Sequence, residues 1–204
     1  MKIGLRHEDK SRWERRTVLT PEDVKLLRDR HNITIAVEPS DIRIFPDESY
    51  RLSGAVLQND LSDCDLILGL KEMPPSFFQP EKKYMFFSHT IKGQSHNMPM
   101  LQRLLDLNCS LFDYERIVDE NNKRLIFFGR YAGLAGMIDG LWALGKRFKK
   151  EGLSTPFEQI DQTYTYSSLE QAKEAVSSAG REIEKNGLPP SIAPLVIGFT
   201  GYGH

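Results

Sequence analysis

Arg16, Lys71 and His89 are the residues of this sequence that best suit chemistry on an anionic substrate. An arginine holds a carboxylate through two parallel hydrogen bonds. A partly desolvated lysine beside a second cation exchanges protons near neutral pH, and histidine is the usual acid–base partner there. A second cation lowers the pKa of such a lysine; Glu72 and Glu115 would oppose this lowering and keep the net charge of the site near zero. These side chains therefore favour a substrate with a carboxylate and a carbonyl or amine centre.

Short apolar segments precede these side chains, and such segments alternate with helical patterns along the chain. This alternation predicts βαβ units and a parallel sheet. The expected strands cover residues 2–5, 33–37, 66–70, 84–87, 110–112, 125–128 and 195–199. Ligands of an open parallel sheet bind beyond the carboxyl ends of its strands. We therefore expect Arg16, Lys71 and His89 to converge on one crevice.

The clearest helix start is Thr20, a natural N-cap that precedes a proline and two acidic residues. The expected helices cover residues 21–30, 95–107, 131–149 and 168–186. Residues 152–167, which contain Pro156, are expected to form an exposed connection. The pattern indicates a domain over residues 1–128, followed by residues 129–204, which hold the connecting helices and the start of a second domain.

Composition argues against several classes of protein. The 27 Lys and Arg residues balance 28 Asp and Glu residues, so no net field favours nucleic acid. No apolar run is long enough to span a bilayer, and no signal or transit segment opens the chain, so we expect a cytoplasmic protein without a membrane partner. Cys64 and Cys109 lack metal-ligand spacing and read as free thiols, and we expect no metal site.

Gly201 and Gly203 follow the last expected strand and match the opening of a dinucleotide-binding turn. The third glycine, the helix and the acidic residue of that motif do not follow within this sequence, and an ordinary turn after a strand is the alternative. We interpret this segment as the first strand of a truncated Rossmann domain, so that the sequence forms the front part of a longer enzyme.

Longer motifs of the sequence resemble one family when they are taken together. They are IGLRHEDKSRWERRTVLTPEDV, LILGLKEMP, YMFFSHTIKGQ, LFDYE, FFGRYAGLAGMIDGL and PLVIGFTGYG. Their order is similar to the lysine–2-oxoglutarate reductase and saccharopine dehydrogenase (lysine-forming) branch of the alanine dehydrogenase/pyridine nucleotide transhydrogenase superfamily. The C-terminal stretch from residue 155 onward looks more like the reductase half of the bifunctional aminoadipic semialdehyde synthases.

The resemblance implies an α/β fold with a Rossmann-like (flavodoxin-like) substrate domain, long connecting helices and an NAD(P)-binding Rossmann domain. It implies an oxidoreductase of lysine metabolism with NAD or NADP as cofactor. Lysine and 2-oxoglutarate would condense to an imine, which hydride from the cofactor would reduce to saccharopine, or the reverse.

The same resemblance assigns roles to individual residues. Lys71 and His89 match an acid–base pair, and Arg16 matches an arginine that binds the substrate carboxylate. The acids that tune the pair are Glu72 and Glu115, the cofactor-loop glycines are Gly201 and Gly203, and a further substrate-binding candidate is Arg130.

Two other interpretations stay open at this point. One keeps the superfamily and replaces the substrate, as in an alanine dehydrogenase or transhydrogenase. The other is a non-catalytic module that binds a small molecule. A homo-oligomer is compatible with each of them, and we expect the isolated chain to fold at least as its substrate domain without turnover.

Overall fold

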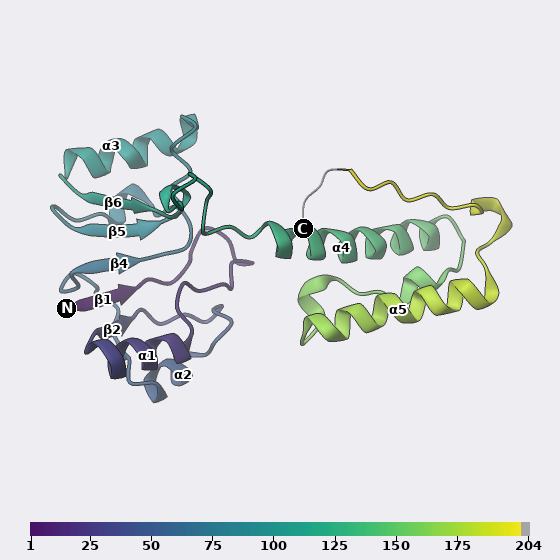
Figure 1. The fold of residues 1–204 in the computed structure, drawn as a ribbon, viewed down its shortest axis with the longest axis horizontal. Helices are drawn as coiled ribbons and strands as arrows, with labels where there is room; N and C mark the ends of the chain where they lie inside the picture. The colour runs from purple at the N-terminus through teal and green to yellow at the C-terminus, as the bar shows by residue number, and fades with distance from the viewer. Residues whose placement is uncertain (201–204) are drawn as a thin grey trace. The chain divides into compact units, whose positions relative to one another are not determined.

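The computed structural model describes residues 1–200 and contains two compact units (Figure 1). The first unit covers Met1–Phe127, and the second begins at Phe128. Gly201 and Gly203, the predicted cofactor-loop glycines, lie outside the described residues.

The first unit is built on a six-stranded sheet in which every paired strand is parallel. The strands are β1 (Lys2–Leu5), β2 (Thr34–Val37), β3 (Val56–Leu57), β4 (Leu66–Leu68), β5 (Lys83–Phe86) and β6 (Ser110–Asp113). Their order in the sheet is β3-β2-β1-β4-β5-β6, so the direction of winding reverses between β1 and β4. The predicted α/β fold with a parallel sheet is confirmed.

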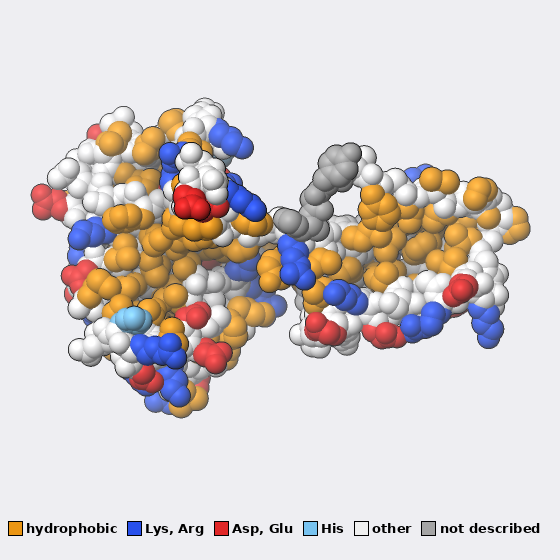
Figure 2. All heavy atoms as spheres, in the orientation of Figure 1, with side chains coloured by type: hydrophobic (Ala, Val, Ile, Leu, Met, Phe, Trp, Pro, Cys, Tyr) orange, Lys and Arg blue, Asp and Glu red, His pale blue; other side chains and the backbone are white. Residues whose placement is uncertain are grey.

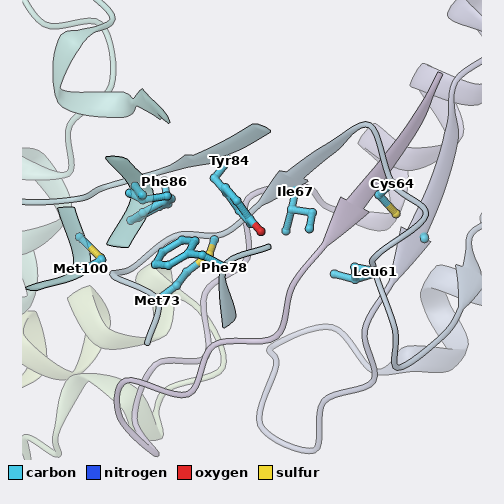
Figure 3. Close-up of a cluster of buried hydrophobic side chains, with 10 residues drawn as sticks. Leu61, Cys64, Ile67, Met73, Phe78, Tyr84, Phe86 and Met100 are labelled. Carbon is cyan, nitrogen blue, oxygen red and sulfur yellow. The ribbon is translucent and has the colours of Figure 1, made fainter. Parts of the chain in front are cut away.

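Helices cover both faces of this sheet. They are α1 (Pro21–His31), α2 (Asp47–Leu52) and α3 (Met98–Asp106). Buried residues of α1 and α2 pack with alternate residues of β1 and β2, whereas α3 packs against a second cluster on β4 and β5. Figure 3 shows part of the second cluster, in which Phe78 meets the ring of Tyr84 edge to face at 4.9 Å.

The loop between β1 and α1 is fixed at its far end by a strong helix start. The Thr20 side chain accepts a hydrogen bond from the Asp23 amide at 3.2 Å, and the Asp23 carboxylate accepts one from the Thr20 amide at 2.8 Å. This reciprocal capping satisfies two donors that the first turn of a helix leaves free. The loop of residues 6–19 is thereby held between a buried strand and a capped helix, at the carboxyl edge of the sheet.

The second unit contains two long helices, α4 (Gly129–Lys150) and α5 (Leu169–Asn186). Short 3₁₀ turns lie at Pro156–Gln159 and Thr163–Thr165 between them. The predicted exposed connection is wrong here, because Phe157 and Ile160 are buried between the helices. Figure 2 shows hydrophobic side chains gathered on the visible face of this unit, beside a row of charged ones.

Two expected strands are absent from the structure. Residues 195–199 are irregular, and Val196 is 84% exposed, so this apolar run has no sheet neighbour to complete its hydrogen bonds. Residues 125–128 likewise form no strand. The antiparallel bridge that precedes them joins Val118 to Arg124 and does not continue into these residues. The predicted first strand of a Rossmann domain is therefore not formed in the described residues.

The remaining short elements of the chain are 3₁₀ turns. They cover Pro75–Phe77, Ser95–Asn97, Tyr114–Arg116 and Pro190–Ile192. Among residues 1–200 no helix is both long and apolar enough to cross a bilayer.

Candidate active site

The reversal between β1 and β4 decides where the polar strand ends meet. In open α/β sheets, ligands bind in the crevice beyond the carboxyl ends of the strands at such a reversal. β1 pairs directly with β4, and β4 pairs with β5. The segments that follow these three strands carry Glu8, then Lys71 with Glu72, and then His89. The sheet therefore brings the predicted acid–base residues to one edge.

Glu72 and His89 form a direct pair at this edge. The carboxylate Oε1 of Glu72 lies 2.8 Å from Nδ1 of His89 and 3.0 Å from Nζ of Lys10. Burial opposes ionisation of Glu72, but hydrogen bonds from its own backbone, His89 and Lys10, with the charge of His89, outweigh it. Together they lower the pKa of Glu72 to about 2. The carboxylate thus stays charged and fixes one nitrogen of the imidazole.

The backbone and the neighbouring ring also hold His89 in place. His89 has a φ of 49°, in the left-handed region that a non-glycine residue adopts only when its surroundings stabilise it. Asn97 donates a hydrogen bond to the His89 carbonyl at 3.2 Å. The ring of Phe87 stacks on the imidazole with centroids 6.1 Å apart. With Nδ1 engaged by Glu72, Nε2 is the nitrogen suited to exchange a proton with a ligand.

Arg16 is held by a neighbouring carboxylate. Its Nε and Nη2 donate to the two oxygens of Glu14 at 2.8 and 2.6 Å, which is the bidentate geometry of a guanidinium with a carboxylate. The hydrogen bond and charge of Glu14 raise the pKa of Arg16 against the effect of burial. Burial likewise opposes ionisation of Glu14, but Arg16 and, less strongly, the charge of Lys71 keep its pKa low. A substrate carboxylate would share or replace this partner.

Lys71 is half-buried, and its backbone is tied to the first strand end. Its amide donates to Oε2 of Glu8 at 3.0 Å, and the amide of Leu70 donates to Oε1 at 2.7 Å. Since the charge of Lys71 acts on Glu14, the lysine and the Glu14–Arg16 pair share one electrostatic environment. The convergence of Arg16, Lys71 and His89 on one crevice stays a prediction, as do the roles of these residues.

Glu115 and Arg130 are the two remaining predicted substrate-binding residues in the described part of the chain. The carboxylate of Glu115 pairs with Nη1 of Arg124 at 3.1 Å, and the guanidinium of Arg124 lies 6.0 Å from the centre of the Phe87 ring. Arg124 and Phe87 thus link Glu115 to His89, because the Phe87 ring stacks on the imidazole. Arg130 is an exposed residue of α4 in the second unit, and its part in the site stays a prediction.

Sequence reasoning missed three residues of the site, Glu8, Lys10 and Tyr114. Glu8 is 7% exposed, and an acid directly beyond a buried strand was a usable signal. No signal in the sequence indicated Lys10, because its contact with Glu72 depends on the path of a loop. Tyr114 is buried, packs on Phe87 at 5.0 Å between centroids, and its hydroxyl has no partner among the described residues.

Two hollows open beside these residues. One of about 320 Å³ is lined on its polar side by Asp9, Lys10, Glu72, His96 and Asn97. The other, of about 680 Å³, is lined by β5 and β6 residues and by Thr90, Asp113 and Arg116. Among the described residues, no group of three or more His, Cys, Asp or Glu side chains is arranged to hold a metal ion.

Comparisons with known proteins show which proteins the chain is similar to. Residues 4–135 match the family described as alanine dehydrogenase/PNT, N-terminal domain. The chain is 47% identical to an alpha-aminoadipic semialdehyde synthase of Arabidopsis thaliana, over 99% of the chain and 20% of that protein. It is 35% identical to a saccharopine dehydrogenase [NAD(+), L-lysine-forming] of Yarrowia lipolytica, over 98% of the chain and 54% of that enzyme.

A solved structure titled L-alanine dehydrogenase shares the fold. Its TM-score is 0.57 at 18% identity, and the match covers 88% of this chain and 53% of that one. The chain spans about a fifth of the length of its Arabidopsis relative and about half of the fungal one. From the match over residues 4–135 and the six-stranded parallel sheet, the chain belongs to the alanine dehydrogenase/PNT N-terminal domain family.

Proposed function

We propose that this chain is the N-terminal part of an NAD(P)-dependent oxidoreductase that interconverts lysine plus 2-oxoglutarate and saccharopine. The observation that carries the proposal is the Glu72–His89 pair, next to Lys71 at the reversal of the sheet. The sequence relatives named as alpha-aminoadipic semialdehyde synthase and saccharopine dehydrogenase support this substrate class.

Residues of the chain account for binding and for proton transfer in this reaction. Arg16 would hold a carboxylate of 2-oxoglutarate, with Glu14 as the partner that the substrate shares or displaces. His89 and Lys71 would pass protons to the carbonyl oxygen that leaves as water, and from the attacking amine, while the imine forms. Glu72 would keep the imidazole oriented and stabilise its protonated form.

The nucleotide, when bound, supplies the hydride that reduces the imine. Gly201 and Gly203 remain the proposed start of its loop, and no step is assigned to them because they lie outside the described residues. The proposed cofactor is NAD or NADP, and the proposed compartment is the cytoplasm. Roles for Glu115 and Arg130 in substrate binding remain part of the proposal.

Titration calorimetry on this chain tests the carboxylate site. We expect 2-oxoglutarate and saccharopine to bind, and Arg16→Ala to weaken binding at least tenfold. Arg51→Ala is the matched control, because Arg51 pairs with Glu48 in the same bidentate way on exposed α2. Equal loss in both variants would show that the effect comes from net charge and would count against Arg16 as the anchor.

A chimera tests the reaction itself. These 204 residues replace the matching segment of the Arabidopsis relative, and lysine- and 2-oxoglutarate-dependent oxidation of NADPH or NADH is followed. We expect turnover in the chimera, at least a hundredfold loss in His89→Ala, and none in the isolated chain. A chimera that folds, binds nucleotide and shows no turnover with these substrates would refute the proposed function.

A further inference from the structure

Glu8 is a buried carboxylate that joins the two strand ends on either side of the reversal. It lies just beyond β1, and its oxygens accept hydrogen bonds from two consecutive amides beyond β4, those of Leu70 and Lys71. The distances are 2.7 and 3.0 Å. Each oxygen therefore has its own donor, and both donors belong to the segment that carries the candidate lysine.

The sheet itself does not satisfy these two amides. Beyond β4, the Gly69 amide still donates to the Met85 carbonyl at 3.0 Å, as in a continuing parallel ladder. At Leu70 the carbonyl still accepts the Phe87 amide at 3.1 Å, but the chain bends at Leu70 and Lys71, and both of their amides donate to the Glu8 carboxylate. A buried amide without an acceptor is strongly unfavourable. Glu8 thus supplies the acceptor for both amides.

The charges around Glu8 come from several elements of the unit. Burial raises the pKa of Glu8, and the hydrogen bonds from Leu70 and Lys71, with the charge of Arg6, only partly offset it. Its charge is felt by side chains beyond β1, in the β2–α2 loop and beyond β6; these are Arg6, Glu14, Arg16, Arg43 and Tyr114. The Glu8 carboxylate therefore interacts electrostatically with side chains from three segments of the unit.

We propose that Glu8 is a positioning residue, which fixes the backbone at Leu70 and Lys71 and so presents the Lys71 side chain next to the Glu14–Arg16 pair. Its consequence for the rate rests on the proposed function, whereas its hold on the backbone does not. No contact of Glu8 with a substrate is required. Loss of the carboxylate is then expected to disturb Lys71 before it disturbs the sheet.

Residue-resolved hydrogen exchange of Glu8→Gln tests the hold on the backbone. An amide side chain offers one oxygen and one NH₂ group to two donors, so at least one hydrogen bond is lost. We expect the amides of Leu70 and Lys71 to exchange at least tenfold faster, with less than threefold change at Ile67 of β4. Glu38→Gln is the matched control, because Glu38 follows β2 and accepts the His7 amide at 3.0 Å.

Kinetics in the chimera test the consequence for Lys71. We expect Glu8→Gln to lower kcat at least tenfold and to leave the KM for 2-oxoglutarate within threefold, because Arg16 keeps its own partner. Glu38→Gln is expected to change neither. Competitive acetylation of Lys71, relative to exposed Lys25, gives a readout without turnover, and we expect it to rise at least threefold in Glu8→Gln.

These measurements separate the two hypotheses. Unchanged exchange at Leu70 and Lys71 in a folded Glu8→Gln protein would overturn the positioning role, as would unchanged kcat in an active chimera. An inactive wild-type chimera would count against the proposed function only. The hydrogen-exchange and acetylation measurements would still decide the role of Glu8. If Glu8→Gln does not fold, Glu8→Asp replaces it, because the shorter carboxylate keeps its charge but cannot reach both amides.

Discussion

Replacing Glu72 by glutamine should destabilise the first unit in a way that depends on pH. The carboxylate lies 2.8 Å from Nδ1 of His89 and 3.0 Å from Nζ of Lys10, and its side chain is 10% exposed. Glu72→Gln keeps the shape and one acceptor oxygen but removes the charge. The substitution therefore isolates the electrostatic part of the pair.

The expected magnitude follows from the pKa. The pKa of Glu72 falls from 4.5 to about 2 on folding. This shift contributes at most about 3 kcal/mol to the free energy of unfolding at pH 6. The amide oxygen retains part of the hydrogen bonding, so we expect Glu72→Gln to cost about 2 kcal/mol at pH 6. A lowered pKa stabilises the folded state above pH 4.5, and this stabilisation is lost as the pH falls toward 2. Between pH 6 and pH 3.5 the difference should shrink by about 1.4 kcal/mol.

Urea unfolding of both proteins at the two pH values measures this difference. Following the amide NMR signals of β4 and β5 restricts the measurement to the first unit. Glu48→Gln is the control, since Glu48 likewise forms an ion pair, with Arg51, but is 57% exposed, and we expect no measurable change from it. A cost of Glu72→Gln that is equal at pH 6 and pH 3.5, or larger at pH 3.5, would refute the assignment of charge stabilisation to this pair.

Two further predictions concern packing. A Cβ at Gly145 would lie 2.6 Å from the Phe157 carbonyl oxygen, so Gly145→Ala should destabilise the second unit by about 1–3 kcal/mol in urea unfolding followed by Trp142 fluorescence. A change below about 0.5 kcal/mol would contradict that close approach. Burial raises the pKa of the Cys64 thiol to about 11, so this thiol should react with Ellman's reagent at pH 8 at least a hundredfold faster in urea than in the native protein. Fast labelling of native Cys64, identified by mass spectrometry, would show that the thiol is accessible.

Local patterns in the sequence were sufficient for most elements of the first unit. The strand at 2–5 and the helix start at Thr20 were predicted correctly, because a short apolar segment and a helix cap depend on residues close together in the chain. β3 was missed, since two residues give no pattern, and α2 was missed because six residues make less than two turns of amphipathic repeat. The strand predicted at 195–199 was wrong, because apolar character alone does not provide a neighbouring strand.

In the candidate site, too, some features were predicted from local patterns and others depend on tertiary contacts. The residue types and their positions after strands identified Lys71, Glu72 and His89, since a polar side chain beyond a buried strand is visible in the sequence. Glu72 lies beside His89 because β4 pairs with β5. Glu8 reaches the same edge because β1 pairs with β4, across more than sixty residues of chain.

Local sequence patterns therefore predicted the class of fold and the residue types proposed for the site. The contacts between these residues depend on the tertiary structure. Glu8 binds the amides of Leu70 and Lys71, and Lys10 reaches Glu72, because loops far apart in the sequence meet where the sheet reverses. Such contacts depend on the free energy of burying charges and amides together, which no local pattern of residues encodes.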